Sequence, residues 1–224
     1  MNKKLSAIQK GCNLNDRIFS EAVKKFRSRS FKTELDVSQF IDFEFKKAGA
    51  KNAFPTIVAS GKNAVEWHHE PTNRKLLAGF CVMDFGAKFH GYCSDMTRTI
   101  YLGEPSRTER RIYSIVKKTQ DACIRKVKAG EGTKELYEFS RKKLGAYKEF
   151  FGHGLGHGLS KLIHAKPRIS RKKGKLKEGD VITIEPGVYI PKVLGIRIED
   201  DVLVTKSGHR VLSKSTKKLV TIKW

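Results

Sequence analysis

Apolar side chains recur at helical spacing along the first part of the chain. In residues 5–26, five apolar positions from Ile18 to Phe26 fall on one face of a helix. A second helix is predicted over residues 33–49, because Thr33 and Asp36 have the spacing of a capping box at its start. We therefore expect the chain to open with two helices.

The pattern then changes to one typical of β-structure. Residues 55–61 and 79–103 are rich in β-branched and aromatic side chains, and the second stretch contains a glycine-bearing turn that predicts a hairpin. After this hairpin the same order begins again. Helices are predicted over residues 105–127 and 133–147, and a second β-rich hairpin is predicted over residues 179–205.

This repeated order indicates two similar halves, residues 1–103 and 104–224. Each half has two helices followed by strands, with a period of about 110 residues and no obvious identity between the halves. The second half also starts with a capping box, formed by Ser106 and Glu109. We predict one α+β domain over residues 1–224, in which the sheets of two ααββ halves join and a site lies between them.

Composition narrows the classes of protein that the chain can belong to. Of the 224 residues, 39% are hydrophobic, which is enough for a core of ordinary size. The chain shows no signal peptide and no run of apolar residues long enough to span a membrane. Its four cysteines form no CxxC pair. We therefore expect a soluble, cytoplasmic protein without a membrane partner.

The charge balance is strongly basic. Lysine and arginine number 46 against 23 acids, which gives a net charge of +23 and raises a nucleic-acid hypothesis. The basic residues are scattered, apart from a denser run over residues 168–179 that we expect to form a connecting loop. Motifs that read or stack bases are missing. A solvated basic surface is the preferred interpretation, and nucleic-acid binding stays an alternative.

Acidic residues interrupt the first predicted hairpin. A turn over residues 88–91 pairs residues whose numbers sum to 179, so Asp84 is expected directly opposite Asp95. Opposed side chains have Cβ atoms roughly 4.5 to 5.5 Å apart, and like charges in this arrangement destabilise a sheet. The flanking residues are apolar and offer little screening by solvent. A bound cation between the two acids is the better explanation.

The second predicted hairpin repeats this arrangement. Glu185 and Glu199 fall nearly opposite one another across a turn over residues 191–195. Two divalent cations would neutralise four carboxylates, and oxygen ligands with one imidazole suit manganese, cobalt, iron or zinc. A pair of such ions is a device for hydrolysis, because it activates a water molecule and polarises a carbonyl.

Four stretches of the chain carry a family resemblance: "DFGAKFHGYCSDMTRT", "GHGLGHGLSKLIH", "TIEPGVYIP" and "GIRIEDDVLVT". They resemble the pita-bread metallopeptidases, and more narrowly the Xaa-Pro branch of prolidase and aminopeptidase P. The resemblance implies two pseudo-symmetric halves around a curved antiparallel sheet, and two divalent metal ions, manganese first. The metal ligands that it implies are Asp84, Asp95, His157, Glu185 and Glu199, with Asp95 and Glu199 bridging the ions.

The same resemblance implies roles in binding and cleaving a peptide with proline at its second position. His153 would line the proline pocket, and His164 would hydrogen-bond the substrate carbonyl or the tetrahedral intermediate. His68 would contact the substrate near the second metal, whereas its neighbour His69 is expected to be exposed. Arg197 would orient ligands or substrate, and Glu185 would act as both ligand and acid/base. The stretch that contains His68, residues 56–76, also matches.

The chain also departs from the family pattern. Ala165 and Lys166 follow His164 where an acid is usual, Ser160 and Lys161 replace small and apolar residues, and Trp67 stands where proline is common. The additional N-terminal domain of most Xaa-Pro relatives is absent from these 224 residues, which leaves the oligomeric state open. Methionine aminopeptidase activity is therefore an alternative. A non-catalytic pita-bread protein that binds RNA or the ribosome is another.

Overall fold

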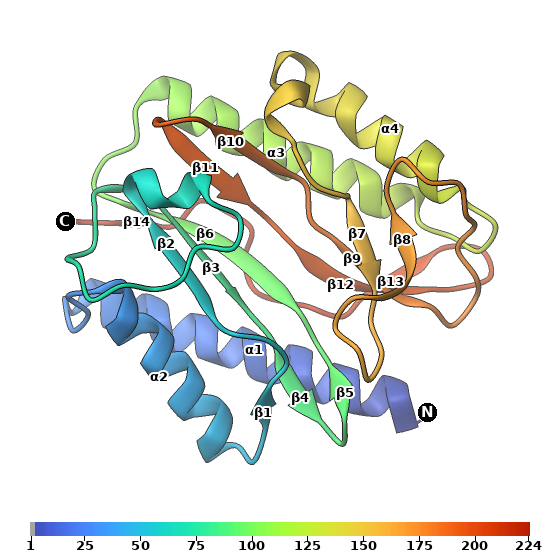
Figure 1. The fold of residues 1–224 in the computed structure, drawn as a ribbon, viewed down its shortest axis with the longest axis horizontal. Helices are drawn as coiled ribbons and strands as arrows, with labels where there is room; N and C mark the ends of the chain where they lie inside the picture. The colour runs from blue at the N-terminus through green and yellow to red at the C-terminus, as the bar shows by residue number, and fades with distance from the viewer. Residues whose placement is uncertain (1–2) are drawn as a thin grey trace.

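The computed structural model describes residues 3–224, and its elements follow the predicted order of helices and strands (Figure 1). The elements of the first part are α1 (Lys3–Arg27), α2 (Glu34–Lys47), β1 (Lys51–Asn52), β2 (Ile57–Ser60), η1 (Gly61–Val65), β3 (Gly79–Phe85), β4 (Ala87–Phe89), β5 (Tyr92–Cys93) and β6 (Met96–Leu102). Those of the second part are α3 (Arg107–Lys126), α4 (Thr133–Leu144), η2 (Gly145–Phe150), β7 (Gly156–Gly158), β8 (Ala165–Ile169), β9 (Val181–Ile184), β10 (Gly187–Ile190), β11 (Leu194–Arg197), β12 (Asp200–Val204), β13 (His209–Val211) and β14 (Thr221–Ile222).

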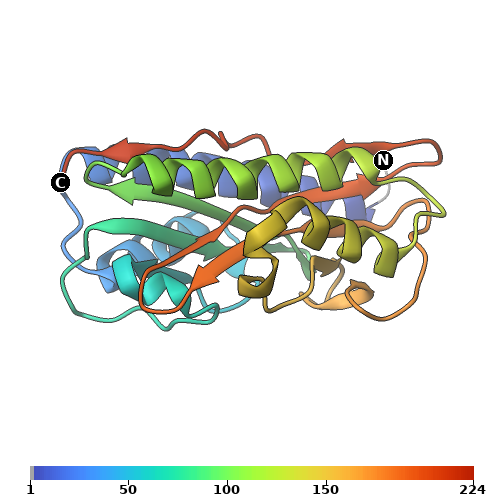
Figure 2. The same cartoon turned by 90° about the horizontal axis from the view of Figure 1, so that it is seen from above.

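The strands occupy the middle of the molecule. In Figure 1, α1 and α2 lie along one side of them and α3 and α4 along the other. One sheet has the order β14-β6-β3-β2 and the other β13-β12-β9-β7-β8, accompanied by the β10–β11 ribbon and the small β1-β4-β5 sheet. Figure 2 shows α1 and α3 together along one long face, with η1 on the opposite face.

The last strand returns to the sheet of the first part. β14 pairs with β6 in parallel, with Thr221 opposite Tyr101 and Ile222 opposite Leu102. The second predicted half therefore contributes a strand to the sheet of the first half. None of the helices described for residues 3–224 has the length and apolar content needed to cross a bilayer.

Local sequence signals explain how the helices begin. The predicted capping boxes are confirmed at α2 and α3, where Thr33 and Ser106 each accept from a backbone N–H three residues later. In both cases the acid at that later position accepts from the N–H of the capping residue. α1 buries the predicted apolar face from Ile18 to Phe26 in a core that it shares with α2 and the first sheet.

The predicted register of the first hairpin is wrong by two residues. Its turn consists of His90 and Gly91, with φ angles of 47° and 81°, and the paired residue numbers sum to 181. Positive φ at both positions of a two-residue turn is the geometry that suits the twist of a hairpin. Asp84 consequently pairs with Thr97, and Asp95 lies just before β6 rather than directly opposite Asp84.

The second hairpin brings Glu185 and Glu199 across from one another as predicted, although its turn is shorter than the predicted one over residues 191–195. Gly187 pairs with Arg197, and beyond the ribbon Ile184 pairs with Asp200, so that the paired numbers sum to 384 on both sides. Glu185 and Glu199 share this sum and lie across from one another, between the two ladders. The ribbon turns over residues 191–193.

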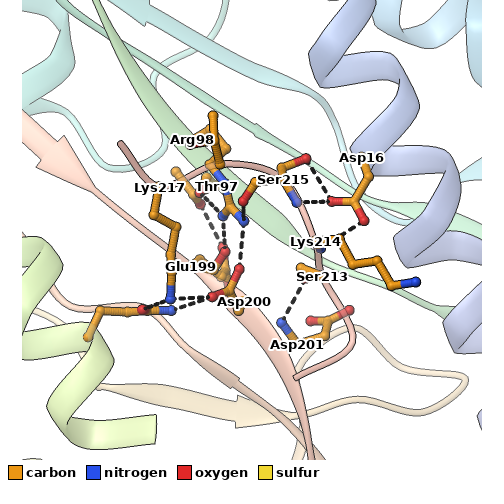
Figure 3. Close-up of polar contacts among 12 residues, drawn as sticks. Asp16, Thr97, Arg98, Glu199, Asp200, Asp201, Ser213, Lys214, Ser215 and Lys217 are labelled. Atoms are coloured by element: carbon orange, nitrogen blue, oxygen red, sulfur yellow. Dashed lines mark hydrogen bonds and ion pairs between the residues drawn. The ribbon is translucent and has the colours of Figure 1, made fainter. Parts of the chain in front are cut away.

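A buried arginine joins the two parts of the structure (Figure 3). Arg98 on β6 is 1% exposed, and its Nη1 donates to the carbonyl oxygens of Thr97 and Glu199. Its Nη2 donates to Asp200 Oδ1 at 2.6 Å and to the carbonyl of Ser215 at 3.1 Å. One guanidinium thus connects β6, β12 and the segment that leads to β14.

Asp200 is the counter-charge of this network. Its Oδ2 accepts from Gln120 Nε2 at 2.8 Å and lies 2.9 Å from Lys217 Nζ. Burial raises the pKa of Asp200, but Arg98, Lys217 and the Gln120 hydrogen bond outweigh burial and hold the pKa below its ordinary value. The carboxylate is therefore charged in the fold.

Removing this charge should destabilise the protein strongly. We expect Asp200→Asn to lower the free energy of unfolding of the metal-free protein by about 3 to 5 kcal/mol, because Arg98 stays buried without its counter-charge. Urea unfolding followed by circular dichroism measures the effect. Glu104→Gln is the control, since Glu104 pairs with Arg110 on the exposed surface and its loss should cost less than about 1 kcal/mol. Equal losses in both variants would contradict this view of the network.

Candidate metal centre and active site

A cavity of about 720 Å³ lies where the two parts of the structure meet. It is bordered by the ends of strands from both sheets and by the segment after η1. The structure brings all nine residues predicted for the site to the border of this cavity. These residues are His68, Asp84, Asp95, His153, His157, His164, Glu185, Arg197 and Glu199.

Three of these side chains could hold one metal ion between them. Asp95, His157 and Glu199 each offer a ligand atom, and these atoms all lie within 4.8 Å of one another. His157 Nε2 lies 3.6 Å from Asp95 Oδ2 and 3.5 Å from Glu185 Oε1. All three side chains of the set are buried, so that an ion held there would be shielded from solvent.

Asp84 borders the same cavity from β3. Its Oδ2 accepts from Arg197 Nη2 at 2.7 Å, while its Oδ1 is buried without a hydrogen-bond partner among the described residues. Arg197 also donates from Nε to Thr97 Oγ1 and from Nη1 to Tyr189 Oη. Arg197 thus holds Asp84 in place from the opposite strand ribbon.

The electrostatics of this cluster call for added positive charge. Burial raises the pKa of Asp95 and Glu199 well above ordinary values, and the neighbouring carboxylates raise it further. Burial also raises the pKa of Glu185 to about 7, with Asp84 adding to the rise. Asp95 Oδ1 is a second buried carboxylate oxygen without a hydrogen-bond partner among residues 3–224. Carboxylate oxygens with free lone pairs, together with an imidazole, fit divalent metal ions.

His157 is in the protonation state that metal binding needs. Burial, followed by the nearby His164, lowers its pKa to about 3, so the imidazole is neutral. Its Nδ1 lies 3.2 Å from the carbonyl oxygen of Gly158 and is assigned the proton, because a carbonyl can only accept. This assignment leaves the lone pair of Nε2 facing the acids.

Hydrogen bonds orient the carboxylates of two of these acids and anchor the backbone of a third. Thr97 Oγ1 donates to Glu199 Oε2 at 2.6 Å, and Thr183 Oγ1 donates to Glu185 Oε1 at 3.1 Å. The backbone N–H of Asp95 donates to Asp201 Oδ2 at 2.9 Å. Groups that orient metal ligands in this way commonly tune metal affinity. The acids are therefore held in place before any ion binds.

A second polar chain leads from Arg197 to His153. Burial, with Arg197 nearby, lowers the pKa of His153 to about 3, so this imidazole is also neutral. Its Nδ1 lies 2.8 Å from the carbonyl of Gly154 and its Nε2 lies 2.9 Å from Tyr189 Oη. The Nδ1–H donates to that carbonyl, so Nε2 accepts from Tyr189, whose oxygen in turn accepts from Arg197 at 2.8 Å.

The remaining predicted histidines stand at the more open part of the cavity. The ring of His164 meets that of His157 edge-on, with centroids 4.6 Å apart. His68 is exposed. Its neighbour His69, predicted to be exposed, is instead half-buried, with Nε2 2.9 Å from Glu34 Oε2. The prediction failed because Glu34 lies 35 residues earlier in the chain, on another element.

Several residues of the site were missed by the sequence analysis. Arg168 was assigned to a connecting loop, but it lies on β8 directly across from His157 and borders the cavity. The alternation of exposed Lys166 and Arg168 was a signal of that strand. Tyr189 gave no signal of its own, because its role depends on contacts with His153 and Arg197.

The comparisons with known proteins agree with this geometry. The sequence pattern of metallopeptidase family M24 matches residues 6–206, and the chain belongs to that family. It is 38% identical to the Xaa-Pro dipeptidase of Pyrococcus horikoshii, over 97% of this chain and 63% of that protein. The chain thus spans less than two thirds of the length of this relative.

Solved structures of Xaa-Pro peptidases are also similar to this chain. The prolidase of Thermococcus sibiricus superposes with a TM-score of 0.92 at 35% identity, over 98% of this chain and 61% of that one. The X-Pro aminopeptidase of Thermotoga maritima also gives a TM-score of 0.92, at 34% identity, over 98% of this chain and 63% of that one. The predicted pita-bread fold is confirmed. The chain, a member of metallopeptidase family M24, is thus similar to Xaa-Pro peptidases in both sequence and fold.

Metal should stabilise the protein more at higher pH. In the metal-free fold the pKa of Glu185 is about 7 and the pKa values of Asp95 and Glu199 are raised, so these acids hold protons that a divalent ion must displace. The rise in melting temperature on adding manganese should therefore grow from about pH 5 to about pH 7.5, as measured by differential scanning fluorimetry. Asp95→Asn should lose most of this rise. A rise that is independent of pH, or one that persists in Asp95→Asn, would refute the assigned ligands.

Proposed function

We propose that residues 1–224 form one catalytic unit of a dinuclear metal-dependent peptidase that cleaves the bond between an N-terminal residue and proline. The observation that carries the proposal is the convergence of all nine predicted residues, namely four acids, four histidines and Arg197, on one cavity. Family membership supports peptide hydrolysis, and the relatives named Xaa-Pro dipeptidase and prolidase support the preference for proline.

Two divalent ions would be held by the residues with free lone pairs in the cavity. Manganese is the first candidate, with cobalt, iron and zinc as alternatives. When bound, the ions supply polarisation of the scissile carbonyl and a lower pKa for the attacking water. The residues that would hold them are Asp84, Asp95, His157, Glu185 and Glu199, all of which border the cavity.

Proton transfer is assigned to Glu185. Its side chain borders the cavity, with Oε1 held by Thr183 and Oε2 3.8 Å from His153 Nδ1. From this position it can take the proton of the attacking water and return it to the leaving nitrogen. His164 and His68 would donate hydrogen bonds to the substrate carbonyl as it gains negative charge.

An aromatic corner of the cavity suits the proline ring. The ring of Trp67 lies 5.3 Å from that of His153 and 5.7 Å from that of Tyr189, measured between centroids. A neutral His153, held by Tyr189 and Gly154, offers an apolar ring face rather than a charge. A compact, rigid apolar side chain such as proline can pack against these faces without leaving a polar group unpaired.

Arg168 supports a preference for short peptide substrates. It borders the cavity, and no hydrogen bond or ion pair to its side chain occurs within residues 3–224. A dipeptide carries its C-terminal carboxylate only one residue beyond the scissile bond, within reach of a cation at the cavity border. Arginine binds carboxylates with two parallel hydrogen bonds. We therefore assign dipeptides as the preferred substrates.

A panel of three peptides tests the proposed specificity. With added manganese or cobalt, Ala-Pro should be hydrolysed faster than Ala-Pro-Ala, and Met-Ala-Ser should be cleaved slowest, as measured by release of the N-terminal residue. Fastest cleavage of Met-Ala-Ser would instead establish methionine aminopeptidase activity. Absence of metal uptake, combined with salt-sensitive RNA binding, would favour the non-catalytic alternative.

Arg168→Ala tests the carboxylate site separately. We expect the KM for Ala-Pro to rise on the order of 10-fold, because a charged hydrogen-bond partner is lost at an exposed position. The KM for Ala-Pro amide, which lacks the carboxylate, should stay close to the wild-type value. Lys173→Ala controls for the loss of a positive charge in the following loop. An equal rise for both substrates would show that Arg168 does not bind the carboxylate.

A further inference from the structure

The segment between β2 and β3 brings Trp67 and His68 to the cavity. After η1 ends at Val65, residues 66–78 form no strand, and Glu66, Trp67 and His68 are exposed. Both Trp67 and His68 nevertheless border the cavity. Something other than sheet pairing must hold them there.

Glu34, the first residue of α2, binds this part of the chain at two places, one before Trp67 and one after His68. Its Oε1 accepts from the N–H of Ser60 at 2.7 Å, from the Ser60 hydroxyl at 2.9 Å and from Asn63 Nδ2 at 3.0 Å. Its Oε2 lies 2.9 Å from His69 Nε2 and accepts from the N–H and hydroxyl of Thr72 at 3.3 and 3.2 Å. One oxygen therefore holds residues 60–63, which precede Trp67 and His68, and the other holds residues 69–72, which follow them.

The Glu34 carboxylate is charged although it is buried. Its side chain is only 1% exposed. Burial raises its pKa, but the hydrogen bonds from Ser60, Asn63 and His69 outweigh burial and lower the pKa overall. A buried carboxylate with six donors around it resists displacement, because every donor would have to find a new partner.

Backbone hydrogen bonds support the same attachment. The N–H of Leu35 donates to the carbonyl of Thr72 at 3.1 Å, and the N–H of Leu76 donates to the carbonyl of Lys32 at 2.9 Å. The arc over residues 64–68, between Asn63 and His69, has no such anchor on α2. Its position is thus set by the two points at which Glu34 holds its flanks.

The arc packs closely against the opposite wall of the cavity. A Cβ atom on Gly152 would lie 2.4 Å from the Trp67 ring, so that only glycine leaves room for the ring at this place. A Cβ on Gly195 of β11 would lie 1.7 Å from the carbonyl oxygen of Ala64. A small shift of the arc would therefore open the contact between Trp67 and His153.

We propose that Glu34 and His69 are positioning residues of the active site, which hold the segment over residues 60–72 so that Trp67 and His68 face the cavity. The role in catalysis rests on the function proposed above, whereas the positioning itself does not. His69 is the member of the pair that can be substituted with less risk to folding. Its Nδ1 also lies 3.2 Å from Glu66 Oε2, inside the arc, so the imidazole connects the anchor to the arc directly.

Trp67 offers a spectroscopic test. The chain has two tryptophans, so a Trp224→Phe background leaves Trp67 as the single emitter. In this background we expect Glu34→Gln and His69→Gln to shift the Trp67 emission to the red and to increase its quenching by acrylamide. The turnover number kcat for Ala-Pro should fall on the order of 10- to 100-fold, whereas metal content measured by elemental analysis should stay unchanged.

Asp36→Asn is the matched control. It removes the capping-box acid of the same helix turn but touches no residue of the arc. Its emission and kcat should stay at the values of the background protein. Changes in Asp36→Asn equal to those in Glu34→Gln would reduce Glu34 to a helix-stabilising residue and overturn the proposal.

Other outcomes separate this proposal from the proposed function. Where Glu34→Gln does not fold, as judged by circular dichroism, His69→Gln decides. Unchanged Trp67 emission in a folded His69→Gln variant overturns the proposal, even if activity falls. If the wild-type protein cleaves none of the peptides, the proposed function fails, and the emission of Trp67 still decides whether Glu34 and His69 position the arc.

Discussion

The structure depends on one electrostatic constraint, which is that four carboxylates share one cavity, two of them buried, while Arg197 forms an ion pair with Asp84. Arg197 satisfies one oxygen of Asp84, but Asp95 and Glu199 are left with raised pKa values and with neighbours of the same charge. Hydrogen bonds from Thr97 to Glu199 and from Thr183 to Glu185 orient two of the acids without neutralising them. Such a cluster is stable in its charged form only when cations join it. This requirement connects the fold to metal chemistry.

Acids elsewhere in the protein show that burial alone does not produce this state. Glu34 and Asp200 are each 1% exposed, like Glu199, yet their pKa values lie below the ordinary range. The difference lies in their partners, since Glu34 has six donors and Asp200 has Arg98 and Lys217. Acids whose charge is balanced by hydrogen-bond donors or cations stabilise the fold, whereas the acids of the metal site lack enough such partners. The same residue type thus serves two purposes in one small chain.

The features of the fold and site that depend on neighbouring residues could be predicted from the sequence. Capping boxes, helix periodicity and the order of elements depend on nearby residues, and the turn of the second hairpin brought Glu185 across from Glu199 as predicted. The first hairpin was misregistered because its turn uses positive φ at His90 as well as at Gly91. The burial of His69 and the return of β14 depend on contacts between distant segments, which no local pattern encodes. The strand that carries Arg168 did have a local signal in its alternating exposed residues, and this signal was overlooked.

The buried guanidinium of Arg98 has a consequence for how the chain reaches this fold. Its acceptors on Glu199, Asp200 and Ser215 lie about a hundred residues further along the chain. Before those residues fold, the sheet that contains β6 must either keep the guanidinium in water or bury it without acceptors. Both options delay compaction. The two parts should therefore acquire structure in a single concerted event rather than one after the other, and a nascent chain that stops short of β12 should stay open.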